Sequence, residues 1–221
     1  MLLKELRLRT NHLSILYNFY KEVLELPTVY SNEKSITILS GTSKLIFEET
    51  NDIDNPFYHF AFNIPSNKFE EAFQWMKKRV ELLWLDDYKS YIADFVNWKA
   101  KSFYFIDPAG NILELIARFV LKDAVDEKYS PAHIRNVSEI GLVFPIESFQ
   151  KDVDNFRKLF PIPYFDKQLP LQHFKAIGND EGVFIVVPKN RIWFSTKNKR
   201  SQIFPMQISF MENNKLYELV I

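Results

Sequence analysis

The chain has 221 residues, of which 47% are hydrophobic and 16% aromatic, enough apolar material for a packed core. Its 28 basic and 28 acidic residues cancel, which argues against a nucleic-acid or anionic-membrane partner, and the absence of cysteine excludes disulfides and thiolate metal sites. No apolar run reaches the roughly 18 to 20 residues that cross a bilayer. We therefore expect a soluble, cytoplasmic protein.

The first part of the chain predicts a strand, a helix and then two strands. Residues 3–10 (LKELRLRT) alternate apolar and charged side chains, as a half-buried strand does. Residues 11–26 repeat apolar side chains at three- and four-residue intervals, which is typical of an amphipathic helix, and Pro27 ends this pattern. Residues 35–41 and 43–50 are typical of two short strands joined by a turn.

The same order of elements returns from residue 57. Residues 57–65 (FYHFAFNIP) predict a strand and residues 66–83 a helix, and strand-like runs follow around 96–98, at 102–106 and at 112–118. The two units are in register, because the same number of residues separates Glu5 from Phe19 and His59 from Phe73. Glu5 and His59 therefore occupy matching positions in an internal repeat.

A polar connector at residues 121–136 precedes a third unit. The expected elements of this last part are a strand at 137–145, a helix at 147–160, a hairpin at 174–188, a continuation of the sheet at 191–196 and a fourth opening strand at 204–210. Too few residues follow this strand to complete a fourth unit.

With these repeats the sequence resembles the vicinal oxygen chelate superfamily, which includes glyoxalase I, extradiol dioxygenases, fosfomycin-resistance enzymes and bleomycin-binding proteins. The resemblance rests on the helix end NFYKEVLELP, the strand YHFAFNIP and above all DPAGNILELIAR, and it covers residues 3–118. It implies an α+β fold of tandem βαβββ modules whose mixed sheets curl into a cup, with the helices outside. We accordingly expect a first domain of paired modules at 1–120, a linker at 121–136 and a truncated second domain at 137–221.

The resemblance also implies a divalent metal, with Glu5, His59 and Glu114 as its ligands. The usual first ligand is histidine or glutamine, so Glu5 departs from the common pattern. The residues themselves agree for His59 and Glu114. In an alternating strand His59 lies opposite the apolar Phe60, and Glu114 is the only charge among apolar neighbours, where a carboxylate needs a cation or donors.

Other roles for these residues stay open. His59 is alternatively a hydrogen-bonded cavity histidine, and Glu114 alternatively pairs with a cation such as Arg7. Glu5 is alternatively solvated, or a catalytic base. Oxygen and imidazole ligands suit Zn, Mn, Fe or Ni, and the sequence does not choose among them.

The third unit places Glu139 and Gln207 at positions that match Glu5 and His59. We expect no metal there, because the strand that would supply a carboxylate is missing with the truncated fourth unit. A structural or homodimer-forming role is expected instead. Arg191 and Trp193 are candidates for a second pocket, although an arginine stacked on an aromatic ring at a sheet edge explains them as well.

These observations predict a metal-dependent enzyme that acts on a small molecule with two adjacent oxygens. The chemistry is a glyoxalase-like proton transfer, with Glu5 and Glu114 as the catalytic carboxylates, or ring cleavage by a dioxygenase. Arg7, Tyr58 and Trp98 are expected to shape the substrate pocket. The alternative is a non-catalytic binding protein of the bleomycin-resistance type, which holds a small molecule without metal.

Overall fold

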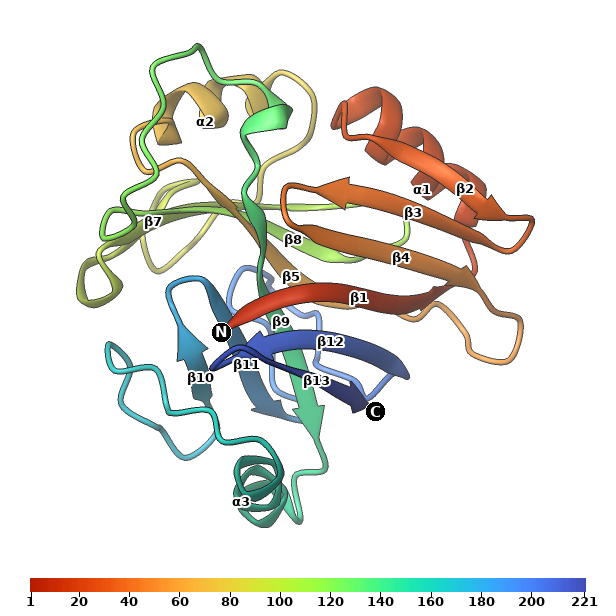
Figure 1. Cartoon of the computed structure of the whole chain (residues 1–221), viewed down its shortest axis with the longest axis vertical. Helices are drawn as coiled ribbons and strands as arrows, with labels where there is room; N and C mark the ends of the chain where they lie inside the picture. Colours follow the sequence, from red (N-terminus) through yellow and green to blue (C-terminus); the bar gives the residue numbers. More distant parts are fainter.

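The computed structural model describes residues 1–221 and contains two β-sheets (Figure 1). The first sheet has six strands, which lie in the order β13 (Lys215–Val220), β12 (Met206–Glu212), β1 (Leu2–Thr10), β4 (Ser43–Glu49), β3 (Ser35–Ser40) and β2 (Thr28–Asn32). The second has seven strands, in the order β10 (Lys175–Asn179), β11 (Gly182–Pro188), β9 (Asn136–Phe144), β5 (His59–Ile64), β8 (Ile112–Arg118), β7 (Ala100–Ile106) and β6 (Ala93–Phe95).

Three helices of more than one turn accompany the sheets, and each belongs to one repeat unit. The helical segments are α1 (Leu13–Asn18), which continues as a π-helix (Phe19–Val23), α2 (Phe69–Lys77), α3 (Phe149–Leu159) and two short 3-10 helices (Val96–Trp98 and Pro131–His133). None of the helices has both the length and the apolar character needed to span a bilayer. The α+β class and the curled sheets expected for tandem βαβββ modules are confirmed.

The units pair differently from the sequence expectation. In each complete unit the opening strand lies parallel to a later strand of the same unit: β1 pairs with β4, β5 with β8, and β9 with β11. Between units, however, β5 pairs with β9 and β1 pairs with β12, both antiparallel. The second unit therefore shares a sheet with the third, and the first shares one with the short fourth. The prediction that the first two units pair with each other within residues 1–120 was therefore wrong.

Burial gives the physical reason for this pairing. Strands β5 and β8 are buried at every position and β9 at all but its last, so both of their faces need cover. Strands β1 and β12 mostly alternate buried and more exposed positions, so one of their faces meets solvent. Strands buried on both faces thus lie together in the middle of one sheet, and alternating strands lie together in the other.

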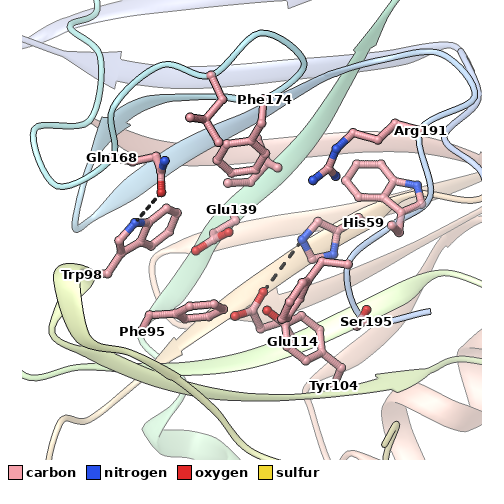
Figure 2. Close-up of a pocket in the computed structure, with 14 residues that line it drawn as sticks. His59, Phe95, Trp98, Tyr104, Glu114, Glu139, Gln168, Phe174, Arg191 and Ser195 are labelled. Carbon is pink, nitrogen blue, oxygen red and sulfur yellow. Dashed lines mark hydrogen bonds and ion pairs between the residues drawn. The ribbon is translucent and has the colours of Figure 1, made fainter. Parts of the chain in front are cut away.

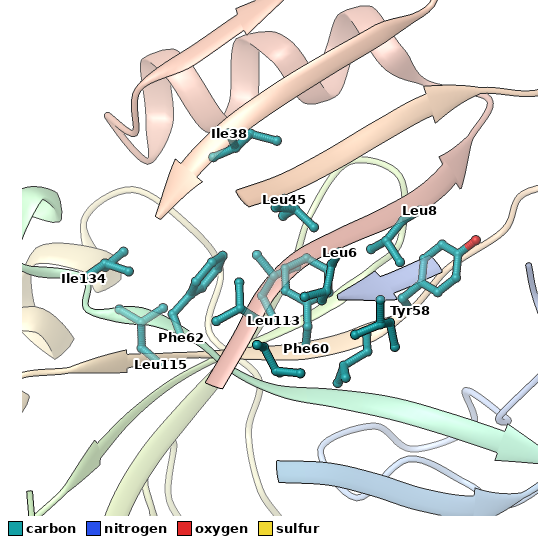
Figure 3. Close-up of a cluster of buried hydrophobic side chains, with 14 of the residues drawn as sticks. Leu6, Leu8, Ile38, Leu45, Tyr58, Phe60, Phe62, Leu113, Leu115 and Ile134 are labelled. Atoms are coloured by element: carbon teal, nitrogen blue, oxygen red, sulfur yellow. The ribbon is translucent and has the colours of Figure 1, made fainter. Parts of the chain in front are cut away.

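The two sheets pack against each other through one continuous apolar core (Figure 3). Leu6 and Leu8 of β1 face Phe60 and Phe62 of β5, and all four side chains are fully buried. Helix α2 covers another part of the same face of the seven-stranded sheet, where the rings of Phe69 and Phe73 contact Phe103 of β7. Alternation along each strand then sends the remaining side chains of the seven-stranded sheet into its opposite, cup-shaped face.

Two segments predicted as strands have another structure. Residues 96–98 form a 3-10 turn, which ends where Lys99 takes a left-handed backbone conformation (φ 50°). Residues 191–196 do not continue a strand but form part of the long connection between β11 and β12. This connection passes over the cup, and it brings Arg191 and Trp193 to the site described next.

Candidate metal centre and substrate pocket

His59 is the first residue of β5, and its side chain is buried in the cup. Its Nδ1 lies 3.2 Å from the backbone carbonyl oxygen of Ile112 on the neighbouring strand β8. Because a carbonyl oxygen only accepts hydrogen bonds, Nδ1 carries the proton and Nε2 presents a lone pair. Nε2 points toward the Glu114 carboxylate, with 3.8 Å between Nε2 and Oε2 (Figure 2). A carbonyl-held imidazole with a free Nε2 is the arrangement found for metal-ligating histidines.

Glu114 lies in the middle of β8, two residues after the start of the strand. The preceding turn sets this position: Asp107 accepts hydrogen bonds from the backbone N–H groups of Ala109 and Asn111, and Gly110 has φ +86°. In the register of β5 and β8, Glu114 lies opposite Ala61, whose small side chain leaves the carboxylate room in the cup. The inward direction predicted for Glu114 is therefore what the structure shows.

Glu139 of the third unit completes a cluster with His59 and Glu114. It lies on β9, where it pairs with Ala61 from the other side, so Glu114 and Glu139 flank the same residue of β5. One ligand atom from each of His59, Glu114 and Glu139 lies within 4.8 Å of the other two, and all three side chains are buried. The structure thus supplies one nitrogen and two carboxylate ligands from three adjacent strands.

Arg118, the last residue of β8, lies beside this cluster and is completely buried. Its Nη2 donates a short hydrogen bond to Glu139, and its Nε donates to Asn63 Oδ1 at 3.3 Å. Nη1 lies 3.8 Å from Asp180, which Lys167 also contacts at 2.5 Å. The guanidinium therefore fixes the Glu139 carboxylate from the side away from His59.

Burial controls the protonation of all three groups. It lowers the pKa of His59 to about 4, so the imidazole is neutral and able to bind a cation at neutral pH. It raises the pKa of Glu139 to about 6, although the positive charge of Arg118 opposes this rise. The pKa of Glu114 lies well above its ordinary value, first because of burial and then because of the nearby charge of Glu139. Two buried carboxylates so close together each favour either a proton or a nearby cation.

A cavity of about 250 Å³ opens above the cluster, and six of its fourteen lining residues are Phe, Trp or Tyr (Figure 2). Trp98 is one of them, and its Nε1 donates a hydrogen bond to Gln168. The remaining lining residues come largely from β6, β7 and the long connections of the third unit: Phe95, Tyr104, Leu171, Phe174, Ile185, Arg191, Trp193, Phe194 and Ser195.

Trp193 sits directly over the backbone of the cup. A Cβ atom placed on Gly141 of β9 would lie 2.5 Å from the ring of Trp193, so glycine is needed at this position. The ring of Trp193 in turn lies 5.1 Å from that of His59. Of the two alternatives for Arg191 and Trp193, the separate second pocket is not found, because both line the same cavity as His59. The other alternative, an arginine against an aromatic ring, agrees with the position of the Arg191 guanidinium carbon 5.4 Å from the ring centroid of Phe174.

Glu5 and Arg7 do not reach this site. Both lie on β1 of the six-stranded sheet, on the face turned away from the shared core. Arg7 bridges Glu5 (2.9 Å) and Glu48 (2.6 Å), and these side chains are between one fifth and one third exposed. The prediction that Glu5 is a metal ligand together with His59 and Glu114 was therefore wrong. The predictions that Arg7 lines the pocket or pairs with Glu114 were wrong as well. Their strand pairs with the fourth unit and not with the second.

Tyr58 is also outside the pocket. It precedes β5 and points to the core side, where its hydroxyl donates to the carbonyl oxygen of Pro205 (2.8 Å) and accepts from the Arg9 N–H (3.1 Å). These two hydrogen bonds tie the connection before β12 to β1, so the role of Tyr58 is structural. Strand alternation explains the error, because neighbours such as Tyr58 and His59 point to opposite faces.

Glu139 was expected at this position of the repeat, but not in a metal site. We expected no metal there because the fourth unit lacks the strand that would supply a carboxylate. In the structure the second carboxylate comes from Glu114 of the second unit. A signal was present in the sequence: Glu139 is the only charged residue in VSEIGLVF, just as Glu114 is the only acidic one in ILELIAR. An isolated carboxylate in a strand that is apolar on both faces points to a buried cation or donor.

Comparisons with known proteins agree with this architecture, although no protein-family model matches the chain. The metallothiol transferase FosB of Staphylococcus saprophyticus is 31% identical over 104 residues, which are 44% of this chain and 64% of that protein. The chain thus spans somewhat less than two thirds of this curated relative.

Two solved structures share the fold across most of the chain. A protein named "putative dioxygenase" from Bacillus subtilis superimposes with a TM-score of 0.62 at 12% identity, covering 100% of this chain and 84% of that one. Glyoxalase I from Zea mays superimposes with a TM-score of 0.52, also at 12% identity, covering 90% of this chain and 70% of that one. The predicted resemblance is confirmed at the level of the fold: the chain has the fold that these glyoxalase and dioxygenase-like structures share.

Proposed function

We propose that the protein is a metal-dependent enzyme that acts on a small molecule with two adjacent oxygen atoms. The observation that carries this proposal is the buried cluster of His59, Glu114 and Glu139 at the floor of a cavity. One imidazole and two carboxylates suit a divalent transition metal and leave coordination positions on the cavity side for a substrate.

The residues fit such an ion in three respects. His59 is held by a backbone carbonyl in the tautomer that leaves Nε2 free. Glu139 is oriented by Arg118, as ligating carboxylates commonly are by hydrogen bonds from residues behind them. Two carboxylates neutralise a divalent charge inside a site that excludes water. When bound, the ion would polarise a substrate oxygen as a Lewis acid.

Of the two carboxylates we assign Glu114 to move a proton. Glu139 is engaged by the Arg118 guanidinium, whereas the ion-pair contact of Glu114 is the 3.8 Å approach to the neutral imidazole of His59. A carboxylate without a cationic hydrogen-bond partner is the better proton acceptor. Glu114 would take a proton from a carbon next to a substrate oxygen and return it to the neighbouring atom. Aromatic side chains next to it limit the contact of this carboxylate with water.

The metal content of protein purified without chelator tests this proposal. We expect about one equivalent of a divalent transition metal per chain in the wild type, and strong loss in Glu139→Gln and His59→Ala. Glu5→Gln is the matched control, because it removes a carboxylate at the corresponding position of the other sheet and should keep the metal. Metal loss in Glu5→Gln with retention in Glu139→Gln would contradict the assignment of ligands.

Activity then distinguishes the reaction types. Isomerisation of a hemithioacetal without oxygen uptake would support proton transfer as the reaction. Oxygen uptake with catechols would instead identify ring cleavage as the reaction. Metal-free wild-type protein that binds small molecules and is unchanged in stability by His59→Ala would identify a non-catalytic binding protein and overturn the enzyme proposal.

A further inference from the structure

Arg191 is a cation in the pocket without an anionic partner. No carboxylate lies within ion-pair distance of its guanidinium, whereas Arg7, Arg9, Arg79 and Arg118 all have such a partner. Its guanidinium instead lies against the ring of Phe174, with 5.4 Å between the guanidinium carbon and the ring centroid. Figure 2 shows the guanidinium on the same side of the pocket as the His59 ring. Loss of solvent contact lowers the pKa of Arg191, as expected for a charge that protein atoms partly enclose.

The charges around the cup do not cancel once the proposed ion is present. Arg118 and Lys167 are matched by Glu139 and Asp180 through the contacts described above. Glu114 and Glu139 would together balance a divalent ion, but Glu139 also pairs with Arg118 and Arg191 has no anion of its own. The cup therefore keeps excess positive charge. A cavity with excess positive charge and aromatic walls favours a ligand that is both anionic and flat or apolar.

We propose that Arg191 is a specificity residue and that the pocket takes small organic acids with an aromatic or comparably sized apolar group. The acid group of the ligand meets the Arg191 guanidinium, and its apolar part lies among Phe95, Trp98 and Phe194. Guanidinium groups bind carboxylates through paired, charge-assisted hydrogen bonds, which makes the interaction selective for the anion. The anion site at Arg191 does not depend on the proposed metal-dependent function. Only the expectation that the same ligand also has two adjacent oxygens rests on that function.

Matched pairs of small aromatic molecules test the two parts separately. Benzoate and benzamide have the same shape and differ in charge, and they lack adjacent oxygens of their own on the ring. 3,4-Dihydroxybenzoate and 3,4-dihydroxybenzamide differ in the same way and add the oxygen pair. Binding of each is measured on the full chain with and without Mn²⁺ or Zn²⁺, from the quenching of tryptophan fluorescence, because Trp98 and Trp193 line the pocket.

For the wild type we expect each acid to bind about tenfold or more tightly than its amide, with or without the metal. Arg191→Gln should weaken the acids by a similar factor and the amides by less than about threefold, and Arg191→Lys should restore part of the difference. Lys197→Gln is the control, since Lys197 belongs to the same connection, is exposed and does not line this cavity. It should leave both ligands unaffected.

The outcomes separate the two proposals. Equal binding of acid and amide to the wild type, or equal losses for both in Arg191→Gln, would overturn the role of Arg191. Preference for acids that depends on Arg191, without any gain from metal for the dihydroxy pair, would support the anion site and count against the metal-dependent function. Because Arg191→Lys keeps the charge and the stem, a folding defect in Arg191→Gln would not prevent the comparison.

Discussion

At the scale of single residues, Arg118 holds one of the proposed metal ligands in position. It is a fully buried cation whose nearest anion is a proposed metal ligand. Burying a charge is tolerated only when partners replace the lost water. Here Glu139 and Asn63 accept hydrogen bonds from Arg118, and Asp180 lies 3.8 Å from Nη1, which itself makes no hydrogen bond. The rings of Trp98 and Phe165 also lie 5.3 and 5.7 Å from its guanidinium carbon. Arg118 is thus a positioning residue that sets the direction of Glu139.

Replacement of Arg118 by methionine should therefore destabilise the protein by about 3 to 5 kcal/mol, because Glu139 is left buried without its cation. The measurement is urea unfolding in the presence of a chelator. Arg79→Met is the control: Arg79 pairs with Glu25 at the surface, and its loss should cost less than about 1 kcal/mol. The double replacement of Arg118 and Glu139 by methionine should recover part of the loss. Similar costs for the two single variants would show that Arg118 does not compensate a buried charge.

The residues of the site were predictable to different degrees. His59 and Glu114 follow from alternation, because a polar side chain on an otherwise apolar strand has to face either a cavity or solvent. Glu139 satisfies the same criterion but depends on which unit adjoins β5, and Arg191 depends on the course of an irregular connection. Neither of these is encoded in a local pattern of residue types.

At the scale of elements, the turn between β7 and β8 shows how one buried carboxyl holds the site strand in place. The Asp107 carboxylate accepts hydrogen bonds from Ala109 N–H, Asn111 N–H, Asn111 Nδ2 and the Tyr20 hydroxyl. Asn111 Oδ1 in turn accepts the backbone N–H of Tyr58, just before His59. The turn that starts the Glu114 strand is thereby joined to the start of the His59 strand.

This turn also predicts a pH dependence of stability. Burial raises the pKa of Asp107 to about 6, although the hydrogen bonds from Asn111 and Tyr20 lower it. Because the folded pKa is above that of the unfolded chain (about 3.9), the carboxyl stabilises the fold most below pH 4 and loses this contribution as the pH rises through about 6. The difference amounts to roughly 3 kcal/mol.

The comparison is the free energy of unfolding of the wild type and Asp107→Asn from pH 4 to pH 8, in chelator. The variant cannot ionise at this position, so the wild type should lose roughly 3 kcal/mol relative to it over this range. Profiles that run parallel across the whole range would show that the Asp107 carboxyl keeps an ordinary pKa in the folded protein.

At the scale of the whole molecule, the repeats were predictable and their partners were not. Helical and strand periodicity locates the opening strands of all four units, since periodicity is a local property. Which opening strands adjoin is a non-local choice among similar edges. The deciding information is whether a strand is apolar on both faces, as in β5, β8 and β9, or on one, as in β1 and β12. Matching strands by this criterion would have given the observed pairs.

The observed pairing predicts the behaviour of a fragment. Residues 1–120 contain the whole of the first two units, which would form a complete metal-binding domain if the expected division of the chain held. In the structure this fragment lacks β9 and β12, so the inner edges of both sheets would be unpaired and Glu139 would be missing. We expect the fragment to aggregate or stay unfolded, and not to bind a stoichiometric metal ion.

Circular dichroism, size-exclusion chromatography and metal analysis of the fragment provide the check, with the full chain purified in parallel. A monomeric, cooperatively folded fragment that retains one equivalent of metal would contradict the arrangement in which the second unit depends on the third.

The ion-paired outer face of the six-stranded sheet matches, position by position, the cup face of the seven-stranded sheet. In its register Glu5 corresponds to His59, Ile46 to Glu114, and Gln207 to Glu139. The molecule thus holds two copies of one framework, of which only one bears a full set of donors. We therefore expect amino-acid substitutions to be distributed unequally among orthologues. Glu5 and Gln207 on the outer face tolerate other polar residues, whereas His59, Glu114, Glu139 and Arg118 are constrained together.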